Sequence, residues 1–141
     1  MALPNGSGGY QVGDGNINET VMGYSSAPTT NAGVTAVTLT AAEITDDILI
    51  LNPGTTGTTY TLPICVTSGA VQGVNDVVSS AKVGSTFDLA IVNIGTSSGT
   101  ATFAAGTGWT IVGLTTVTYT TSAQFRARKT SDTTWTLYRI T

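Results

Sequence analysis

The chain of 141 residues contains no histidine and one cysteine, and only 9% of its residues are charged. Histidine is the commonest general base and metal ligand, so its absence excludes Ser-His-Asp and Cys-His catalysis and His-based zinc sites. One cysteine excludes a disulfide within the chain. No segment approaches the roughly 18 to 20 apolar residues that span a bilayer. We therefore expect a protein that is not an enzyme, needs no cofactor or metal, and does not cross a membrane.

Threonine and glycine dominate what is present: the chain has 29 threonines and 17 glycines, about a third of its residues. Threonine is β-branched and suits a pleated, half-exposed surface, while glycine supplies turns. A chain of this length forms one domain with an ordinary core. The composition therefore predicts an all-β fold.

Residues 1–33 differ from the rest, because they are rich in Gly, Asn, Ser, Thr and Pro and their apolar residues follow no regular period. Such a segment makes no core of its own, yet it is too apolar for a freely solvated tail. We expect an extended N-terminal arm that orders against a surface, with a disordered leader as the alternative. The segment has no basic leader and no continuous apolar stretch, so we expect no secretory signal and synthesis in the cytoplasm.

Residues 34–141 predict a single β domain, because turn signals recur about every ten residues, as in a sandwich or barrel of short antiparallel strands. The run 48–51 is continuously apolar, which predicts a central strand covered on both faces. Segment 87–94 is the strongest strand, with Phe87, Leu89 and Ile91 facing the core. From residue 100 onward we expect a meander of hairpins. The expected strands span residues 34–40, 48–51, 60–66, 87–94, 100–104, 109–112, 117–121, 123–129 and 135–140.

Two segments predict helical structure. Thr40-Ala41-Ala42-Glu43 has the form of a capping box, with a hydroxyl followed three residues later by a carboxylate, and predicts a single helical turn. Valines at positions 71, 74, 77 and 78 recur at three- and four-residue spacing, which predicts one short helix within residues 71–81.

The few charges are segregated along the chain. Residues 1–81 carry six of the eight acidic residues and no basic one, whereas residues 82–141 hold all five basic residues. In the strand 123–129, alternation places Phe125 and Ala127 inward and Arg126 and Arg128 outward. One interpretation is that this charge asymmetry sets the register between neighbouring copies or between this chain and another protein. The other is that both sets of charges are simply solvated, and both interpretations stay open.

Two acidic patterns suggest a calcium site and an acid/base pair, and both are incomplete. The segment 14–18 resembles the opening of a calcium loop, but Glu19 stands where glycine is needed and Ser25 where a bidentate glutamate is needed. Asp46 and Asp47 are adjacent, so in an extended chain they point to opposite faces and form no acid/base pair.

Other patterns have a structural interpretation beside a functional one. The basic cluster 126–129 is the candidate for nucleic acid, but the isoelectric point of about 4.4 means that the whole chain repels a polyanion, so no nucleic-acid partner is expected.

Thr-x-Thr patterns favour cross-strand threonine pairs over an ice-binding ladder, because no strict repeat exists. Cys65 lies in a strand-like segment and is expected to be a buried, small apolar side chain rather than a reactive thiol. Four aromatic residues are candidate platforms for carbohydrate and serve equally well as core or interface anchors: Trp109, Tyr119, Trp135 and Tyr138.

Three stretches have a familiar pattern when taken together: Tyr60-Thr61-Leu62-Pro63, residues 82–95 leading to 99–110, and residues 125–128 with 136–140. They resemble a small β module found in virion proteins of tailed phages, including capsid decoration (cement) proteins and tail-fibre-associated proteins. The opening, residues 4–16, is similar to the start of short phage structural proteins of the decoration type. The resemblance covers nearly the whole chain and is one of pattern, without a chemical signature.

The resemblance implies a β-sandwich or jelly-roll-like fold, a homotrimer and no enzymatic site. Proteins of this kind sit at threefold or quasi-threefold positions on the outer capsid and fasten adjacent capsomers, so the expected partners are the major capsid protein and other copies of this chain. A tail or tail-fibre component that contacts host glycans is the alternative. We expect the interface to use apolar anchors in the arm and basic residues in the body: Tyr10, Val12, Ile17, Met22, Tyr24, Arg126, Arg128 and Lys129.

Overall fold

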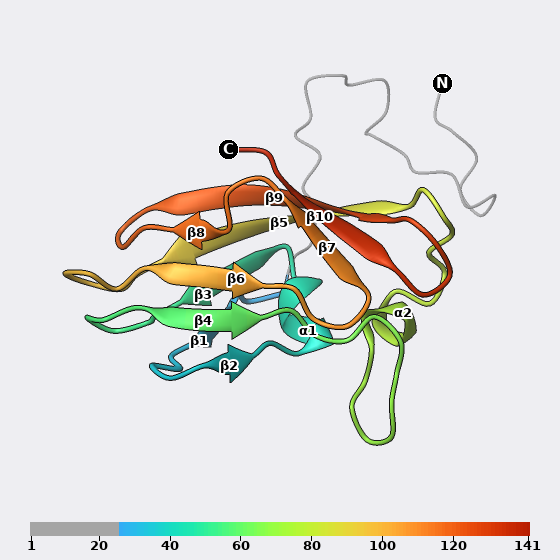
Figure 1. Ribbon diagram of the computed structural model, residues 1–141, viewed down its shortest axis with the longest axis horizontal. Helices are drawn as coiled ribbons and strands as arrows, with labels where there is room; N and C mark the ends of the chain where they lie inside the picture. Colours follow the sequence, from blue (N-terminus) through green and yellow to red (C-terminus); the bar gives the residue numbers. More distant parts are fainter. Residues whose placement is uncertain (1–25) are drawn as a thin grey trace, which may run out of the picture.

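The computed structural model describes residues 26–141, which form a mostly β structure of two mixed sheets and two short helices (Figure 1). The six-stranded sheet contains, in order across it, β1 (Thr29–Asn31), β3 (Ile48–Leu51), β5 (Thr86–Asn93), β9 (Ser122–Lys129), β10 (Trp135–Arg139) and β7 (Trp109–Val112). The four-stranded sheet contains β2 (Val37–Thr38), β4 (Thr58–Thr61), β6 (Ala101–Ala104) and β8 (Thr116–Val117). The helices are α1 (Ala41–Ile44) and α2 (Val74–Val77).

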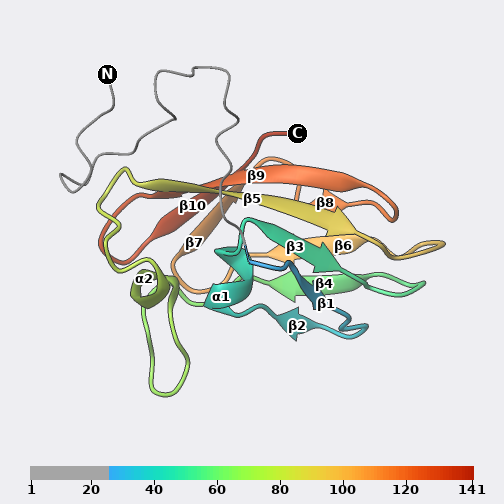
Figure 2. The same ribbon diagram turned by 180° about the vertical axis from the view of Figure 1, so that it is seen from behind.

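The first six strands alternate between the two sheets. The chain places β1, β3 and β5 side by side in one sheet and β2, β4 and β6 side by side in the other, and all four of these neighbouring pairs are parallel (Figure 2). A chain that crosses to the facing sheet after each strand returns to the first sheet in its original direction, so its successive passes stack as parallel neighbours. The first half of the body is therefore a short coil of three passes through two sheets.

The sequence pattern predicts antiparallel strands, but five of the eight strand pairings in the structure are parallel. The meander expected from residue 100 onward is also wrong. Consecutive strands β6, β7 and β8 lie in alternate sheets, and β9 with β10 form the one antiparallel hairpin between consecutive strands in the described residues. The expected strands 48–51, 109–112, 123–129 and 135–140 agree with the structure to within one residue, and β7 matches the segment 109–112. The strands expected at 34–40, 60–66 and 117–121 are shorter or shifted, since β2, β4 and β8 cover only 37–38, 58–61 and 116–117.

The core lies between the facing sides of the two sheets. The ring of Phe103 on β6 meets the ring of Phe125 on β9 at 5.5 Å between centroids, so an aromatic contact joins one sheet to the other. Leu89 and Ile91 on β5 are buried as expected, and Phe87 is half-buried against Trp135. Each large apolar side chain buried here contributes roughly 1.5–3 kcal/mol relative to its exposed state.

The strand β3 is covered on one face only. Leu49 and Leu51 are fully buried, while Ile48 is 39% exposed. The expectation of a strand covered on both faces is therefore wrong. The reason is that β3 is an interior strand of its sheet, but the outer face of that sheet has no second layer of strands among the described residues.

Both helical predictions correspond to single turns. The capping box at α1 is confirmed, since the Thr40 hydroxyl accepts from the Glu43 amide and the Glu43 carboxylate accepts from the Thr40 amide at 2.7 Å. The helix expected within residues 71–81 is shorter than its pattern, because α2 spans only four residues. Valine is a poor helix former, and α2 begins at a glycine that supplies no side-chain cap.

The strand β1 lies inside the range 1–33 that the sequence assigns to the arm. It pairs with β3, and the Asn31 amide donates to the Glu43 carboxylate of α1 at 2.9 Å. The six-stranded sheet therefore begins at Thr29, before the expected boundary at residue 34. The proposed arm anchors Tyr10, Val12, Ile17, Met22 and Tyr24 lie outside the described residues, as does the calcium-like segment 14–18.

Candidate interaction surfaces

The outer face of the six-stranded sheet carries an ion pair between neighbouring strands. Arg126 on β9 lies directly opposite Asp88 on β5, and its guanidinium donates to both carboxylate oxygens, at 2.6 and 2.9 Å. The hydrogen bond from Arg126 lowers the pKa of Asp88 and raises the pKa of Arg126. Both residues belong to the part of the sequence that holds the basic residues, 82–141, and the charge of Arg126 is already compensated there by Asp88.

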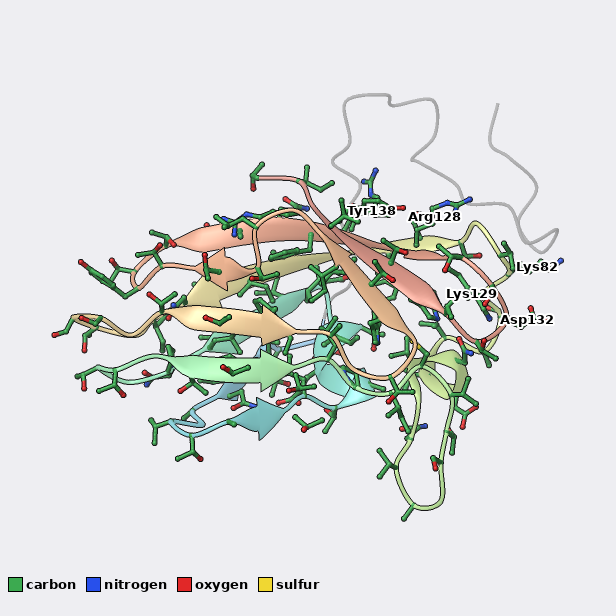
Figure 3. The ribbon with its side chains drawn as sticks, in the orientation of Figure 1. Lys82, Arg128, Lys129, Asp132 and Tyr138 are labelled. Carbon is green, nitrogen blue, oxygen red and sulfur yellow. The ribbon has the colours of Figure 1, made fainter. Side chains whose placement is uncertain are left out.

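Arg128 and Lys82 are the exposed cations without an ion-pair partner in residues 26–141. Arg128 lies on the same outer face, opposite Thr86, and Lys82 lies in the loop before β5. Figure 3 shows Arg128 and Tyr138 on the side of this sheet that faces away from the four-stranded sheet, with Lys82 towards one end. This region is the strongest candidate for contact with an acidic partner surface.

Lys129 does not belong to that surface. The alternation of β9 that exposes Arg126 and Arg128 turns Ala123, Phe125, Ala127 and Lys129 inward. Lys129 is buried, and its ammonium donates to the carbonyl of Ala81 at 3.1 Å, which attaches the segment before β5 to β9 (Figure 3). The structure therefore assigns Lys129 to the fold and corrects its expected place among the interface charges.

The outer face of the four-stranded sheet has no charged residue on its strands. The outward positions are occupied by threonine and alanine, and the pairing confirms the expected cross-strand threonine pairs Thr38 with Thr61, Thr59 with Thr102, and Thr102 with Thr116. We refer to these five residues and Ala104 as the threonine face. A face without charge has a low desolvation cost on docking.

An apolar groove of about 470 Å³ opens beside this sheet, where β2 and β4 end. One wall is the segment 38–42, which leads into α1, and the other is formed by residues 63–64 and 70–72 of the loop between β4 and α2. The main chain of this loop is held by pairing between Ser68 and Val71 and by Gly73, whose amide donates to the Thr67 hydroxyl. Val71 stands on the groove wall with 56% of its surface exposed.

Two of the four candidate carbohydrate platforms are core residues. Trp109 and Trp135 are buried, and their indole N–H groups donate to the Pro63 carbonyl at 2.7 Å and to the Asn75 side chain at 2.9 Å. A buried ring presents no face to a sugar, so these two are excluded as platforms. Tyr119 is 40% exposed, and it keeps the alternative function open.

The Cys65 side chain is buried, as expected, and burial raises its pKa to about 11. A protonated thiol is a poor nucleophile, so Cys65 packs as a small apolar group. In the part of the chain that the structure describes, no three acidic or cysteine side chains gather at a metal-binding distance, and no helix has the length and apolar character to cross a membrane.

Asn93 is a residue that the sequence pattern did not single out. It ends β5 in a fully buried position, where its amide donates to the carbonyls of Gly99 at 2.9 Å and Val117 at 2.8 Å and accepts from the Gly95 N–H at 2.8 Å. Since β5 and β8 belong to different sheets, this side chain links the two layers. An asparagine in line with the inward apolar positions Phe87, Leu89 and Ile91 of the same strand is the signal that would have identified it.

A scan against protein-family models, a search of curated proteins and a search of solved structures each found no match to this chain.

Proposed function

We propose that this chain is a structural protein of a tailed-phage virion, a decoration protein that binds the outer capsid as a homotrimer and stabilises the contacts between capsomers. In this proposal the two layers are a β-sandwich of jelly-roll-like kind that carries no catalytic site. The observation that carries the proposal is the threonine face, a side of the molecule whose strands contain no charged residue. The resemblance of segments 60–63, 82–110 and 125–140 to virion proteins supports the same conclusion.

Decoration is a binding function, and its physics agrees with this surface. A protein that binds the assembled lattice and not the free subunit stabilises that lattice by mass action. A trimer that binds through three identical chains combines three weak contacts, so its overall affinity for the capsid is much higher than that of one chain. In the proposal the threonine face lies against the major capsid protein. Arg128 lies on the opposite face of the molecule, so we assign Arg128 and Lys82 to contact with acidic groups of a neighbouring protein outside the contact made by the threonine face.

The arm belongs to this proposal through its sequence alone. Residues 1–25 contain the five apolar anchors and no basic residue. At roughly 3.3 Å per extended residue, such a segment reaches beyond the body of one domain. We place its anchors on the capsid or on a neighbouring copy.

Head binding by variants tests the proposal. The double variant Thr59→Lys with Thr102→Lys places two charges on the threonine face, and we expect it to fold but to lose binding to expanded heads of the parent phage. The matched control is Gln124→Lys, which adds a charge at an exposed position of β9 on the opposite face. Deletion of residues 1–25 leaves β1 intact and is also expected to weaken head binding.

Two results would refute the proposal: unimpaired head binding by the double variant, or no binding by the unmodified protein. The alternative function, a tail component that contacts host glycans, is favoured by the exposed Tyr119 ring. Specific sugar binding on a glycan array that Tyr119→Ala abolishes would establish the alternative.

A further inference from the structure

The apolar groove beside β2 has the dimensions and chemistry of a protein-binding pocket. Its volume, about 470 Å³, lies in the range of preformed ligand sites, and its walls are mainly alanine, leucine, isoleucine, valine and proline. Glu43, the charged residue of α1, accepts hydrogen bonds from Asn31 and from Thr40, a residue that lines the groove. The groove therefore offers an apolar floor with negative charge beside it.

The turn between β7 and β8 offers a complementary projection. Leu114 at its tip is 63% exposed, the highest value among the large apolar side chains of the described residues, and Val112 beside it is 47% exposed. Gly113 has a φ of +102°, a conformation that L side chains rarely adopt, so the turn has a defined shape. Arg139 supports the turn from behind, since its guanidinium donates to the carbonyls of Leu114 and Thr116.

The groove and the turn lie on opposite edges of the four-stranded sheet, since β2 and β8 are its two edge strands. They also come from parts of the chain with opposite charge. Residues 1–81, which form the groove, contain no basic residue, and residues 89–131, which include the turn, contain no acidic residue. A second copy of this chain therefore presents to the groove an apolar tip backed by the Arg139 guanidinium, while the Glu43 carboxylate lies beside the groove.

We infer that the Leu114 turn of one copy inserts into the groove of the next copy, so that the chain self-associates head to tail. A contact between two different patches on opposite sides of a subunit generates a ring when the rotation between neighbours closes. Closure after three copies gives the homotrimer. The inference rests on the self-association in the proposed function and is independent of capsid binding.

The test measures the mass of the full-length protein in solution by light scattering. Leu114→Asp places a negative charge on the tip, and Val71→Asp places one on the groove wall. The matched control is Val83→Asp, which changes an equally exposed valine, 56% in both cases, in the loop before β5. We expect the unmodified protein and the control to have the mass of three chains, and the two other variants to have the mass of one chain with an unchanged circular dichroism spectrum.

Cysteine cross-linking gives a second readout that does not depend on weakening the contact. Position 71 lies in the loop beside the β2 edge of the four-stranded sheet and position 114 in the turn that leads into β8 at its other edge, too far apart for a disulfide within a chain. The double variant Leu114→Cys with Val71→Cys is expected to form a covalent trimer on mild oxidation, and a protein with only the buried Cys65 is expected to form none. Either a trimeric Leu114→Asp variant, a double variant without cross-links, or a monomeric unmodified protein would overturn the inference.

Other occupants of the groove have distinct outcomes. If residues 1–25 fill the groove, their deletion and Val71→Asp change the mass while Leu114→Asp does not, and the inference is wrong. If all variants remain trimeric and still bind heads, the inference fails while the proposed function stands. If the cross-linked trimer forms but binds no heads, the proposed function fails while the inference stands.

Discussion

Asn93 offers the sharpest test of how the two sheets are joined. Its side chain makes three hydrogen bonds of 2.8 to 2.9 Å in a fully buried position. Asn93→Ala removes all three, each with a net value of about 1 kcal/mol, and leaves buried polar groups with fewer hydrogen-bond partners at a further cost of about 1 kcal/mol or more. We expect the free energy of unfolding to fall by about 4 kcal/mol, a large part of the 5–15 kcal/mol of a typical domain.

Urea denaturation at fixed protein concentration measures this loss. With a slope of about 2 kcal/mol per molar urea, the midpoint falls by roughly 2 M. The matched control Gln124→Ala changes an exposed residue of β9 and is expected to shift the free energy by less than about 0.5 kcal/mol. A loss below about 1 kcal/mol for Asn93→Ala would refute the conclusion that this side chain joins the layers.

Asn93→Asp adds a pH-dependent version of the same test. The carboxylate keeps the acceptor for the Gly95 N–H but faces two carbonyl oxygens, and burial and repulsion raise its pKa in the folded state above the unfolded value. A raised folded pKa means that the folded state binds the proton more tightly, so this variant gains stability relative to the unmodified protein as the pH falls through that pKa. Equal pH dependence of the two proteins would contradict the geometry.

Three further predictions concern the thiol, a close backbone contact and the surface ion pair. Because the folded pKa of Cys65 is raised from 9.0 to about 11, its contribution to stability is present below pH 9 and lost as the pH rises to about 11, and a thiol reagent is expected to label it at pH 8 only after unfolding. Gly106→Ala is expected to cost about 3 kcal/mol or more by urea denaturation, because its Cβ would lie 1.9 Å from a carbonyl oxygen, while Gly69→Ala, with open space around it, costs only about 1–2 kcal/mol of backbone strain. The stabilisation from Asp88 and Arg126 is present above the unfolded pKa of the aspartate and is lost as the pH falls through its lowered folded pKa, so a double-mutant cycle is expected to show coupling at pH 7 that vanishes in strong acid.

The positions of the strands could be predicted from the sequence because they depend on local alternation. The inward and outward positions of β9 follow its pattern, and Phe125 and Ala127 are buried as expected while Arg126 and Arg128 are exposed. The same alternation places Lys129 inward. Adjacency in the chain suggests that Lys129 belongs with its charged neighbours, whereas the period of two along the strand separates it from Arg126 and Arg128.

The pairing of the strands could not be predicted in this way. Thr30 pairs with Ile50, and Ile50 with Val92, so the registers join residues far apart in the sequence. Turn signals every ten residues mark where a chain changes direction, but they do not distinguish a return to the same sheet from a crossing to the facing sheet. The parallel coil is therefore a property of non-local contacts.

The candidate surfaces depend on the same non-local contacts. The threonine face requires four strands from separate parts of the chain to lie in register, and the groove joins segment 38–42 to segment 63–72. The compensation of Arg126 by Asp88 requires β5 and β9 to be neighbours. The sequence predicted which residue types would occupy the surface, and the topology determined which of them meet.

The central claim is that this chain works as one of many copies attached to a larger shell, and a cryo-EM map of the parent particle tests it most directly. The account predicts density for this fold, in groups of three, at threefold or quasi-threefold positions on the outside of the capsid, with the four-stranded sheet towards the shell. A particle whose capsid carries no such density, with the chain found as single copies elsewhere or missing from the virion, would contradict it.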